Sequence, residues 1–335
     1  MLKTLTPFIT FASIFLLSFT ACKKDDSDNN NSGNNSSRVI VSGYLNESPS
    51  IWYGASLKTL EEGDGIARAL AKSGNDIYAC GDDNTSFPRL ACYWKNNVKT
   101  LIASNAVANS IFVENQNVYV AGVINDTLPF VSVNGIVEPL QLPSNTFYYD
   151  QDAYDILVNN GDVIVVGSVE IRAAAWFNNV LTYLSPPSSS GQASAVTIGP
   201  NGVYICGYYF DPTLPAFKAC YWLNGSQFDI SDGSNSCYAY DIAVSGNDVY
   251  ICGAARDGSA PELRAVVWKN GTMQSLTGGQ TEARARSISI KGNDIYVCGF
   301  EADQTSGNYI PKYWKNGEPV NLSSSDGEAY SILVN

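Results

Sequence analysis

The sequence predicts an all-β fold made of seven copies of one four-stranded unit, and three observations carry this prediction. A pattern of similar residues recurs along the chain, every copy contains the same strand and turn signals, and one copy is divided between the two ends. Repeats of about 40 to 45 residues with four short strands each are typical of the blades of a β-propeller.

Six copies of the repeat begin at an alanine, as in AYDIAVSGNDVYICG at 239–253 and ARSISIKGNDIYVCG at 285–299. Each copy predicts a first strand with alternating apolar residues, a tight turn of Gly, Asn or Asp, and a second strand that ends in Gly. A variable loop, a third strand and a short fourth strand follow. The third strand carries a tryptophan in six copies and Ser132 in the remaining one. The tryptophans are Trp52, Trp94, Trp176, Trp222, Trp268 and Trp314.

The seventh copy is split between the ends of the chain. Residues 329–335 (AYSILVN) supply a first strand with nothing after it, and residues 39–43 (VIVSG) supply a second strand with nothing before it. Pairing these two strands closes a ring of blades and removes its free edges. The sequence therefore predicts one seven-bladed β-propeller of four-stranded antiparallel blades over residues 38–335, closed by the C-terminal strand.

The first 37 residues have a different character. Residues 1–21 combine a basic start with a short apolar stretch, as in a signal peptide. The run LLSFTAC resembles the bacterial lipobox, although Phe19 stands where that motif usually has Leu. The resemblance implies that Cys22 carries lipid, and an ordinary secretory signal is the alternative. Residues 22–37 contain no aliphatic side chain, which predicts a flexible tether.

The residues after Cys22 bear on where the protein is exported. Residues 23–26 (KKDD) resemble the export signal that follows the lipidated cysteine in surface lipoproteins of Bacteroidota. The resemblance implies a protein anchored by lipid in the outer membrane and exposed at the cell surface. The repeat itself, written A-x-x-I-x-V-x-x-G-N-x-V-Y-V-x-G, resembles the SBBP-type propeller repeats of bacterial surface proteins. That resemblance covers nearly the whole mature chain and implies the fold and a surface setting, but no common activity.

Charge and composition exclude several classes of function. The formal net charge is −12 and the chain has no histidine, which argues against nucleic-acid binding and against catalysis or metal binding by histidine. The sequence has no nucleophile elbow, phosphate loop or dinucleotide fingerprint. We therefore expect no cofactor, no metal and a monomeric protein.

The predicted turns separate two faces of the ring. The loops between first and second strands and between third and fourth strands are short and alike, whereas the other loops are long and differ in every blade. The long loops define a variable face, where binding residues are expected. The residue after each repeat's alanine should lie on that face, near the mouth of the central channel. These residues are Arg68, Asn109, Tyr154, Ser194, Tyr240, Arg286 and Tyr330.

Ring closure would place Arg286, Tyr330 and Arg68 side by side. Such a cluster would suit a carboxylate, a sulfate or a sugar ring, and the alternative is that these side chains pack together and fill the channel. Further aromatic residues fall in predicted long loops and suggest recognition of a glycan or a protein, unless they hold the loops down. They are Phe147, Tyr148, Tyr149, Tyr208, Tyr209, Phe210, Tyr238 and Tyr309.

Seven cysteines remain once Cys22 is assigned to lipid. Cys80 and Cys206 precede the Gly that ends a second strand, and Cys92 and Cys220 lie two residues before a third-strand tryptophan. Because these positions should lie across a hairpin from each other, Cys80–Cys92 and Cys206–Cys220 are candidate disulfides. The alternative is that they are small buried residues.

Acidic residues are also frequent in the predicted long loops, either as solvated charges or as pairs for hydrolysis or calcium. They are Asp82, Asp83, Asp150, Asp152, Asp257, Glu262, Glu301 and Asp303.

The sequence favours a non-enzymatic binding module for a glycan or a protein. The alternative is a glycosidase or lyase that uses loop carboxylates with Arg68 or Arg286 and Tyr330, and an envelope component with a purely structural role is a third candidate.

Overall fold

The computed structural model describes residues 38–144, 151–256, 258 and 260–335. Cys22 and the predicted tether lie outside the described residues. So do Phe147, Tyr148, Tyr149, Asp150 and Asp257. None of the described residues forms a helix that is long and apolar enough to cross a membrane.

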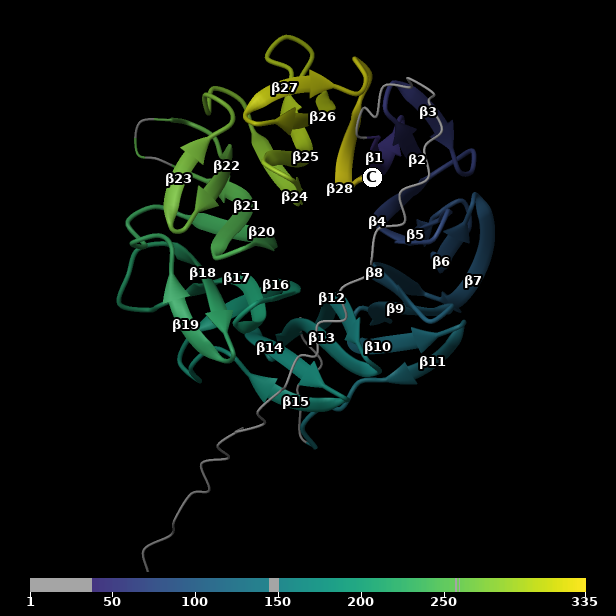
Figure 1. Ribbon diagram of the computed structural model, residues 1–335, viewed down its shortest axis with the longest axis horizontal. Helices are drawn as coiled ribbons and strands as arrows, with labels where there is room; N and C mark the ends of the chain where they lie inside the picture. The colour runs from purple at the N-terminus through teal and green to yellow at the C-terminus, as the bar shows by residue number, and fades with distance from the viewer. Residues whose placement is uncertain (1–37, 145–150, 257, 259) are drawn as a thin grey trace, which may run out of the picture. The chain divides into compact units, whose positions relative to one another are not determined.

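The described residues form seven antiparallel sheets of four strands, arranged as blades around a central axis (Figure 1). Each blade is a meander whose first strand lies nearest the axis. Blade 1 contains β28 (Gly327–Val334), β1 (Val39–Leu45), β2 (Ser48–Tyr53) and β3 (Ser56–Thr59). Blade 2 contains β4 (Gly65–Ser73), β5 (Asp76–Asp83), β6 (Leu90–Lys95) and β7 (Val98–Ser104). Blade 3 contains β8 (Ala106–Glu114), β9 (Asn117–Ile124), β10 (Leu128–Val133) and β11 (Ile136–Pro139).

The remaining four blades repeat the same order. Blade 4 contains β12 (Asp152–Asn159), β13 (Asp162–Val169), β14 (Arg172–Phe177) and β15 (Val180–Tyr183). Blade 5 contains β16 (Ser190–Gly199), β17 (Gly202–Phe210), β18 (Phe217–Leu223) and β19 (Ser226–Asp229). Blade 6 contains β20 (Cys237–Ser245), β21 (Asp248–Ala255), β22 (Arg264–Lys269) and β23 (Thr272–Ser275). Blade 7 contains β24 (Ala283–Lys291), β25 (Asp294–Ala302), β26 (Tyr309–Lys315) and β27 (Glu318–Asn321).

The C-terminal strand closes the ring, which confirms the predicted closure. Strand β28 pairs antiparallel with β1, with Ile332 opposite Val41, and Figure 1 shows the two strands side by side. The amide of Asn335 also donates to the carbonyl oxygen of Arg38 at 3.1 Å. Blade 1 is therefore assembled from both ends of the chain, and every inner strand has a neighbour on each side around the axis.

Every inner strand carries a β-bulge near its start, and the bulge explains the repeat's alanine and glycine. In blade 2, Ala67 pairs with Gly81 and Ala69 pairs with Cys80, so Arg68 has no partner in the ladder. The same shift occurs in all seven blades, and a bulge re-aims the side chain of the extra residue. The bulged residues are Tyr330, Arg68, Asn109, Tyr154, Ser194, Tyr240 and Arg286.

The six tryptophans lie between the blades and are almost completely buried. Blade 3 has Ser132 at this position, and Phe130 two residues earlier compensates for the missing ring. The ring of Phe130 covers Gly122 on the neighbouring strand, as the ring of Trp268 covers Gly253 in blade 6. The core of blade 3 is therefore filled by a different residue from the same face of the strand.

The predicted disulfides are wrong, because Cys80, Cys92, Cys206 and Cys220 are free thiols. Cys92 pairs with Gly81, so it lies opposite the residue after Cys80, and Cys220 is offset from Cys206 in the same way. A one-residue offset directs two side chains to opposite faces of a sheet. Cys80 accordingly packs in the core between blades 2 and 3, and Cys92 packs in the core between blades 1 and 2.

The face with short turns is held by a repeated asparagine. In blade 2, the Oδ1 atom of Asn96 accepts a hydrogen bond from the amide of Ile77 at 3.0 Å, and its Nδ2 atom donates to Asp76 at 2.7 Å. Equivalent asparagines bridge the two short turns in other blades, such as Asn270 in blade 6 and Asn316 in blade 7. Arg38 and Asn335 lie on this face, because the β28–β1 pair takes the place of one of its turns.

Candidate functional site

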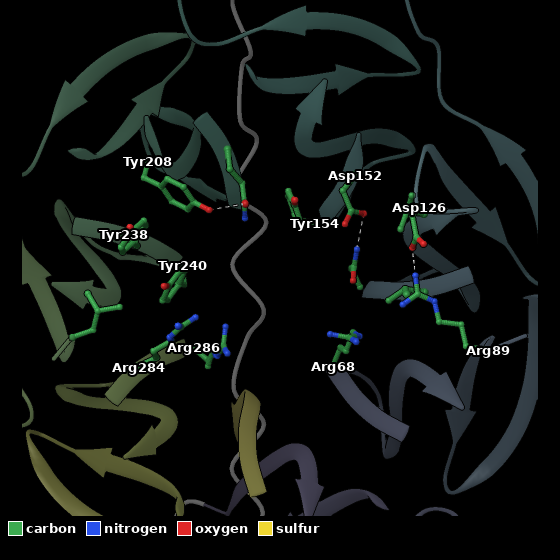
Figure 2. Close-up of a pocket in the computed structure, with 15 residues that line it drawn as sticks. Arg68, Arg89, Asp126, Asp152, Tyr154, Tyr208, Tyr238, Tyr240, Arg284 and Arg286 are labelled. Carbon is green, nitrogen blue, oxygen red and sulfur yellow. Dashed lines mark hydrogen bonds and ion pairs between the residues drawn. The ribbon is translucent and has the colours of Figure 1, made fainter. Parts of the chain in front are cut away.

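A pocket of about 690 Å³ opens on the variable face, where the inner strands begin. Strands and loops from blades 2 to 7 contribute to it, and we call it the mouth pocket. Figure 2 shows Tyr208, Tyr238, Tyr240, Arg284 and Arg286 on one side, with Arg68, Arg89, Asp126 and Asp152 on the other. The lining residues are Arg68, Arg89, Val107, Asn109, Val123, Asp126, Asp152, Tyr154, Gln192, Tyr208, Tyr238, Tyr240, Leu263, Arg284 and Arg286.

Five of the seven bulged residues line the mouth pocket, namely Arg68, Asn109, Tyr154, Tyr240 and Arg286. The other two take different positions. The ring of Tyr330 lies between two guanidinium groups. Its centroid is 5.8 Å from the Cζ atom of Arg68 and 5.0 Å from the Cζ atom of Arg286. The hydroxyl of Ser194 lies 3.4 Å from the side-chain amide of Gln192. The three residues that ring closure brings together therefore form a cation–π stack beside the pocket.

Buried carboxylates hold two of the arginines in place. The Nε atom of Arg68 donates to Asp82 at 2.6 Å, and the Nη2 atom of Arg286 donates to Glu328 at 2.9 Å. Asp82 is 1% exposed and Glu328 is 7% exposed. Asp82 is thus a buried anchor on β5 and not the solvated loop charge that was one expectation for it. Each guanidinium keeps other N–H groups for a ligand, because the planar fork has five donors.

Tyrosines form one wall of the mouth pocket. The rings of Tyr208 and Tyr238 meet edge to face with their centroids 4.9 Å apart, and Tyr238 and Tyr240 lie nearly parallel at 6.3 Å. Phe217 supports Tyr208 and Tyr238 from behind, at 5.7 and 5.6 Å. Burial, with a smaller contribution from the neighbouring tyrosines, raises the pKa of Tyr208, so its hydroxyl stays protonated. The expectation that these aromatics lie in loops was wrong, since Tyr208 belongs to β17 and Tyr238 to β20.

Asp152 is the carboxyl group that lies deepest in the opposite wall. Its Oδ1 atom accepts a hydrogen bond from the Nδ2 atom of Asn109 at 2.8 Å. Burial raises the pKa of Asp152 to about 7, although the charges of Arg68 and Arg89 oppose this shift. Nearer the rim, Arg89 forms an ion pair with Asp126, whose side chain is 72% exposed. The wall therefore contains one carboxyl that titrates near neutrality and one solvated ion pair.

Below the mouth pocket, side chains that follow the bulges connect neighbouring blades. The Oδ2 atom of Asp155 accepts the amide of Val196 at 2.8 Å, and the Oδ2 atom of Asp241 accepts the amide of Ile288 at 2.9 Å. The hydroxyl of Ser110 donates to Asp155 at 2.6 Å. Burial raises the pKa of Asp155 to about 7 and that of Asp241 to about 6. These carboxyl groups fix the spacing of the inner strands and thus the width of the pocket above them.

The other predicted residues do not join the mouth pocket. Asp83 is buried and accepts from Lys99 at 2.6 Å, while Glu301 accepts from Lys312 at 2.7 Å. The hydroxyl of Tyr309 lies 3.2 Å from Glu282.

Three more predicted residues lie outside the lining of the mouth pocket, namely Phe210, Glu262 and Asp303. Tyr209 packs in the core between blades 4 and 5 and donates to Asp229. Within the described part of the chain, no group of three or more Cys, Asp or Glu side chains is placed to hold a metal ion.

Sequence reasoning missed four polar lining residues: Arg89, Asp126, Gln192 and Arg284. Arg284 lies two residues before the bulged Arg286, and Gln192 two residues before the bulged Ser194. The alternation of side chains along a strand could have identified both. Arg89 and Asp126 lie between the second and third strands of their blades, and their position depends on loop conformation that the repeat does not encode.

Comparisons with known proteins found similarity in structure and none in sequence. No model of a protein family matches the chain, and no curated protein matches it. Solved structures do resemble it, among them a putative 6-phosphogluconolactonase from Bacteroides fragilis at 12% identity and a TM-score of 0.51, covering 91% of this chain and 100% of that one. The WD40 β-propeller domain of Doa1 is 13% identical with a TM-score of 0.48, over 90% of this chain and 94% of that one. TolB from Acinetobacter baumannii is 10% identical with a TM-score of 0.47, over 88% of this chain and 66% of that one. At these identities the likeness concerns the fold alone.

Proposed function

We propose that this protein is a lipid-anchored surface protein that binds a glycan at the mouth pocket without transforming it. The observation that carries the proposal is the pairing of a tyrosine wall with arginines that buried carboxylates hold in place. Aromatic rings stack on the apolar faces of sugars, and fixed N–H donors recognise their oxygens. A cavity of about 690 Å³ is within the size range of small-ligand sites, roughly 300–1,000 Å³.

The bulged residues support a binding role for a second reason. The alanine before each bulge is the same in all seven blades, and so is the glycine opposite it, whereas the bulged residue itself varies among Arg, Tyr, Asn and Ser. The bulge therefore needs its alanine and glycine but leaves the extra residue free. Five blades of one design thus present different bulged side chains to one pocket, as a binding site requires.

The described part of the chain enters the propeller on the short-turn face. Arg38 lies on this face, opposite the mouth pocket. A proposed anchor on Cys22, which precedes Arg38 in the sequence, therefore joins the propeller on the face that does not carry the mouth pocket.

The described residues favour binding over hydrolysis. Glycosidases use two carboxyl groups on either side of the scissile bond. Asp152 has the raised pKa of a proton donor, but the other carboxylate in the lining, Asp126, is solvated and paired with Arg89. The described lining therefore contains one recessed carboxyl group and no second buried carboxylate that could complete such a pair.

The test uses the mature chain with Cys22→Ser, which keeps the protein soluble, on a glycan array and in pull-downs with bacterial surface proteins. We expect retention of glycans by this chain and loss of at least about tenfold in affinity with Tyr240→Ala. Lys58→Ala, on the exposed outer strand β3, is the matched control and should bind normally. Capture of a protein with no glycan bound, or release of shortened glycans, would contradict the proposal.

A further inference from the structure

We infer that the mouth pocket selects acidic saccharides, and that Asp152 takes up a proton when their acidic group binds beside Arg68 and Arg89. The inference rests on the proposed function and specifies its ligand. A hexuronate or a sulfated sugar has both the apolar ring face and the anionic oxygens that the two walls require.

Arg68 is positioned to bind an anionic group of a ligand. Its Nε atom is engaged by Asp82, which is nearly inaccessible, so the direction of the guanidinium plane is fixed before any ligand arrives. The side chain itself remains 24% exposed. Figure 2 shows it on the same side of the pocket as Asp152 and Arg89 and facing Arg286 across it. A pre-oriented fork binds carboxylate and sulfate oxygens through paired N–H groups at little entropic cost.

Asp152 controls the charge of this wall. Arg68 on β4 and Arg89 before β6 favour its ionised form, and Asn109 on β8 donates to it. The nearby acidic groups are Asp82, which binds Arg68, Asp126 after β9 and Asp155 on its own strand. The adjacent strands β13 and β16 present the uncharged Ser168 and Gln192. When protonated, a carboxyl group is a neutral hydrogen-bond donor, and when ionised it repels an anion.

The direction of the proton coupling follows from these charges. Burial raises the pKa of Asp152 to about 7. A bound anion favours the neutral form of a neighbouring carboxyl group and raises its pKa further. Binding near pH 7 therefore draws a proton from solution, and affinity for an acidic saccharide increases as the pH falls from 8 to 6.

Tyrosines on the opposite wall require that the ligand also has a ring to stack against them. Tyr208, Tyr238 and Tyr240 form a continuous aromatic surface across the pocket from Arg68 and Asp152 (Figure 2). A free carboxylate or an inorganic sulfate could contact the arginines but not this wall. The ligand must therefore carry its acidic group on a ring, and isolated anions should bind much more weakly.

The experiment is a calorimetric titration of the mature Cys22→Ser chain at pH 6, 7 and 8. The probes are tetragalacturonate, its methyl ester and a chondroitin sulfate tetrasaccharide, with cellotetraose as a neutral sugar. We expect an acidic probe to bind at least about tenfold more tightly than its neutral counterpart, more tightly at pH 6 than at pH 8, and with net proton uptake in buffers of different ionisation enthalpy.

Three variants separate the parts of the inference. Arg89→Ala removes a side chain at the exposed rim and should lower the affinity for the acidic probes about tenfold. Arg256 is an exposed arginine of the variable face outside the pocket, and Arg256→Ala should leave this affinity unchanged. Asp152→Asn should bind acidic probes with no pH dependence between 6 and 8. Because Arg68→Ala would leave the buried Asp82 without its ion-pair partner, Arg68→Lys tests the guanidinium fork while keeping the charge.

Each result decides a different point. Equal or tighter binding of the neutral probes would overturn the inference while supporting the proposed glycan function. Binding of no saccharide at any pH would overturn both. Preserved pH dependence in Asp152→Asn would overturn the proton coupling, and unchanged affinity in both Arg89→Ala and Arg68→Lys would remove the arginines as the acidic subsite.

Discussion

A side chain on residue 81 would collide with the carbonyl oxygen of Ile66, and Gly81 avoids this contact because it has no Cβ. The close approach arises from the bulge at Arg68, which pushes the backbone of β4 against β5. The glycines at the same position in the other blades meet the equivalent carbonyl oxygen, for example that of Tyr238 at Gly253. The same local geometry that demands glycine also turns the bulged side chain towards the mouth pocket.

We expect Gly81→Ala to lower the free energy of unfolding by about 2–3 kcal/mol, since backbone on both strands must shift. Gly278→Ala is the matched control, because a Cβ there meets nothing within 4 Å and its φ is not positive. Denaturant unfolding of both variants provides the measurement. Equal stability of the two would mean that the bulge does not impose the glycine.

The repeat encodes the ring, the tryptophan positions and the bulged residues, because each depends on a pattern that recurs in every blade. It does not encode the partner of each side chain. Cys80 and Cys92 lie on adjacent strands, but a register offset of one residue places them on opposite faces. Asp82 lies where a loop was expected, and it is buried because β5 continues past Gly81 and Arg68 neutralises it. Contacts of this kind depend on registers and loop paths that are specific to single blades.

Ring closure makes β28 essential for stability. Ile332 is 3% exposed and packs in the core between blades 7 and 1. We expect Ile332→Asp to cost about 3 kcal/mol or more, because it buries an unpaired charge and removes an apolar side chain. Leu57→Asp, at a position 44% exposed on the outer strand β3, should change stability by no more than about 0.5 kcal/mol.

Scanning calorimetry distinguishes the two variants at the closing strand. A melting temperature of Ile332→Asp equal to that of Leu57→Asp would show that the ring does not depend on the C-terminal strand.

Burial of Asp155 makes stability depend on pH. Its pKa in the folded protein is raised from 3.8 to about 7, so its stabilising contribution is complete below pH 4 and is lost as the pH rises through 7. Asp155→Asn cannot ionise. The melting temperature of Asp155→Asn minus that of the wild type should therefore increase between pH 5 and pH 8.

Asp76→Asn is the control for this comparison. Hydrogen bonds from Lys95 and Asn96 hold the pKa of Asp76 below its usual range, so it does not titrate between pH 5 and pH 8. Its melting temperature relative to the wild type should be constant over that interval. If the melting-temperature difference between Asp155→Asn and the wild type were also constant over this interval, Asp155 would have its ordinary pKa in the folded protein.

The proposed lipidation of Cys22 predicts how the full chain behaves in cells. In a bacterial host that processes lipoproteins, the wild-type chain should incorporate labelled palmitate and partition into detergent, and Cys22→Ala should do neither. Protease added to intact cells of a Bacteroidota host should digest the wild-type chain if it is exposed at the surface. Labelling of Cys22→Ala would rule out Cys22 as the lipidated residue.

Hydrogen–deuterium exchange with and without the most tightly bound oligosaccharide shows most directly where a ligand binds. If the bulged residues form the site, amides in residues 65–69, 106–110, 152–155, 237–241 and 283–287 should exchange more slowly in the complex, because these segments surround the mouth pocket. The short turns at 73–76 and 291–294 should not change. Protection confined to those turns or to the outer strands would contradict the assignment of the mouth pocket as the binding site.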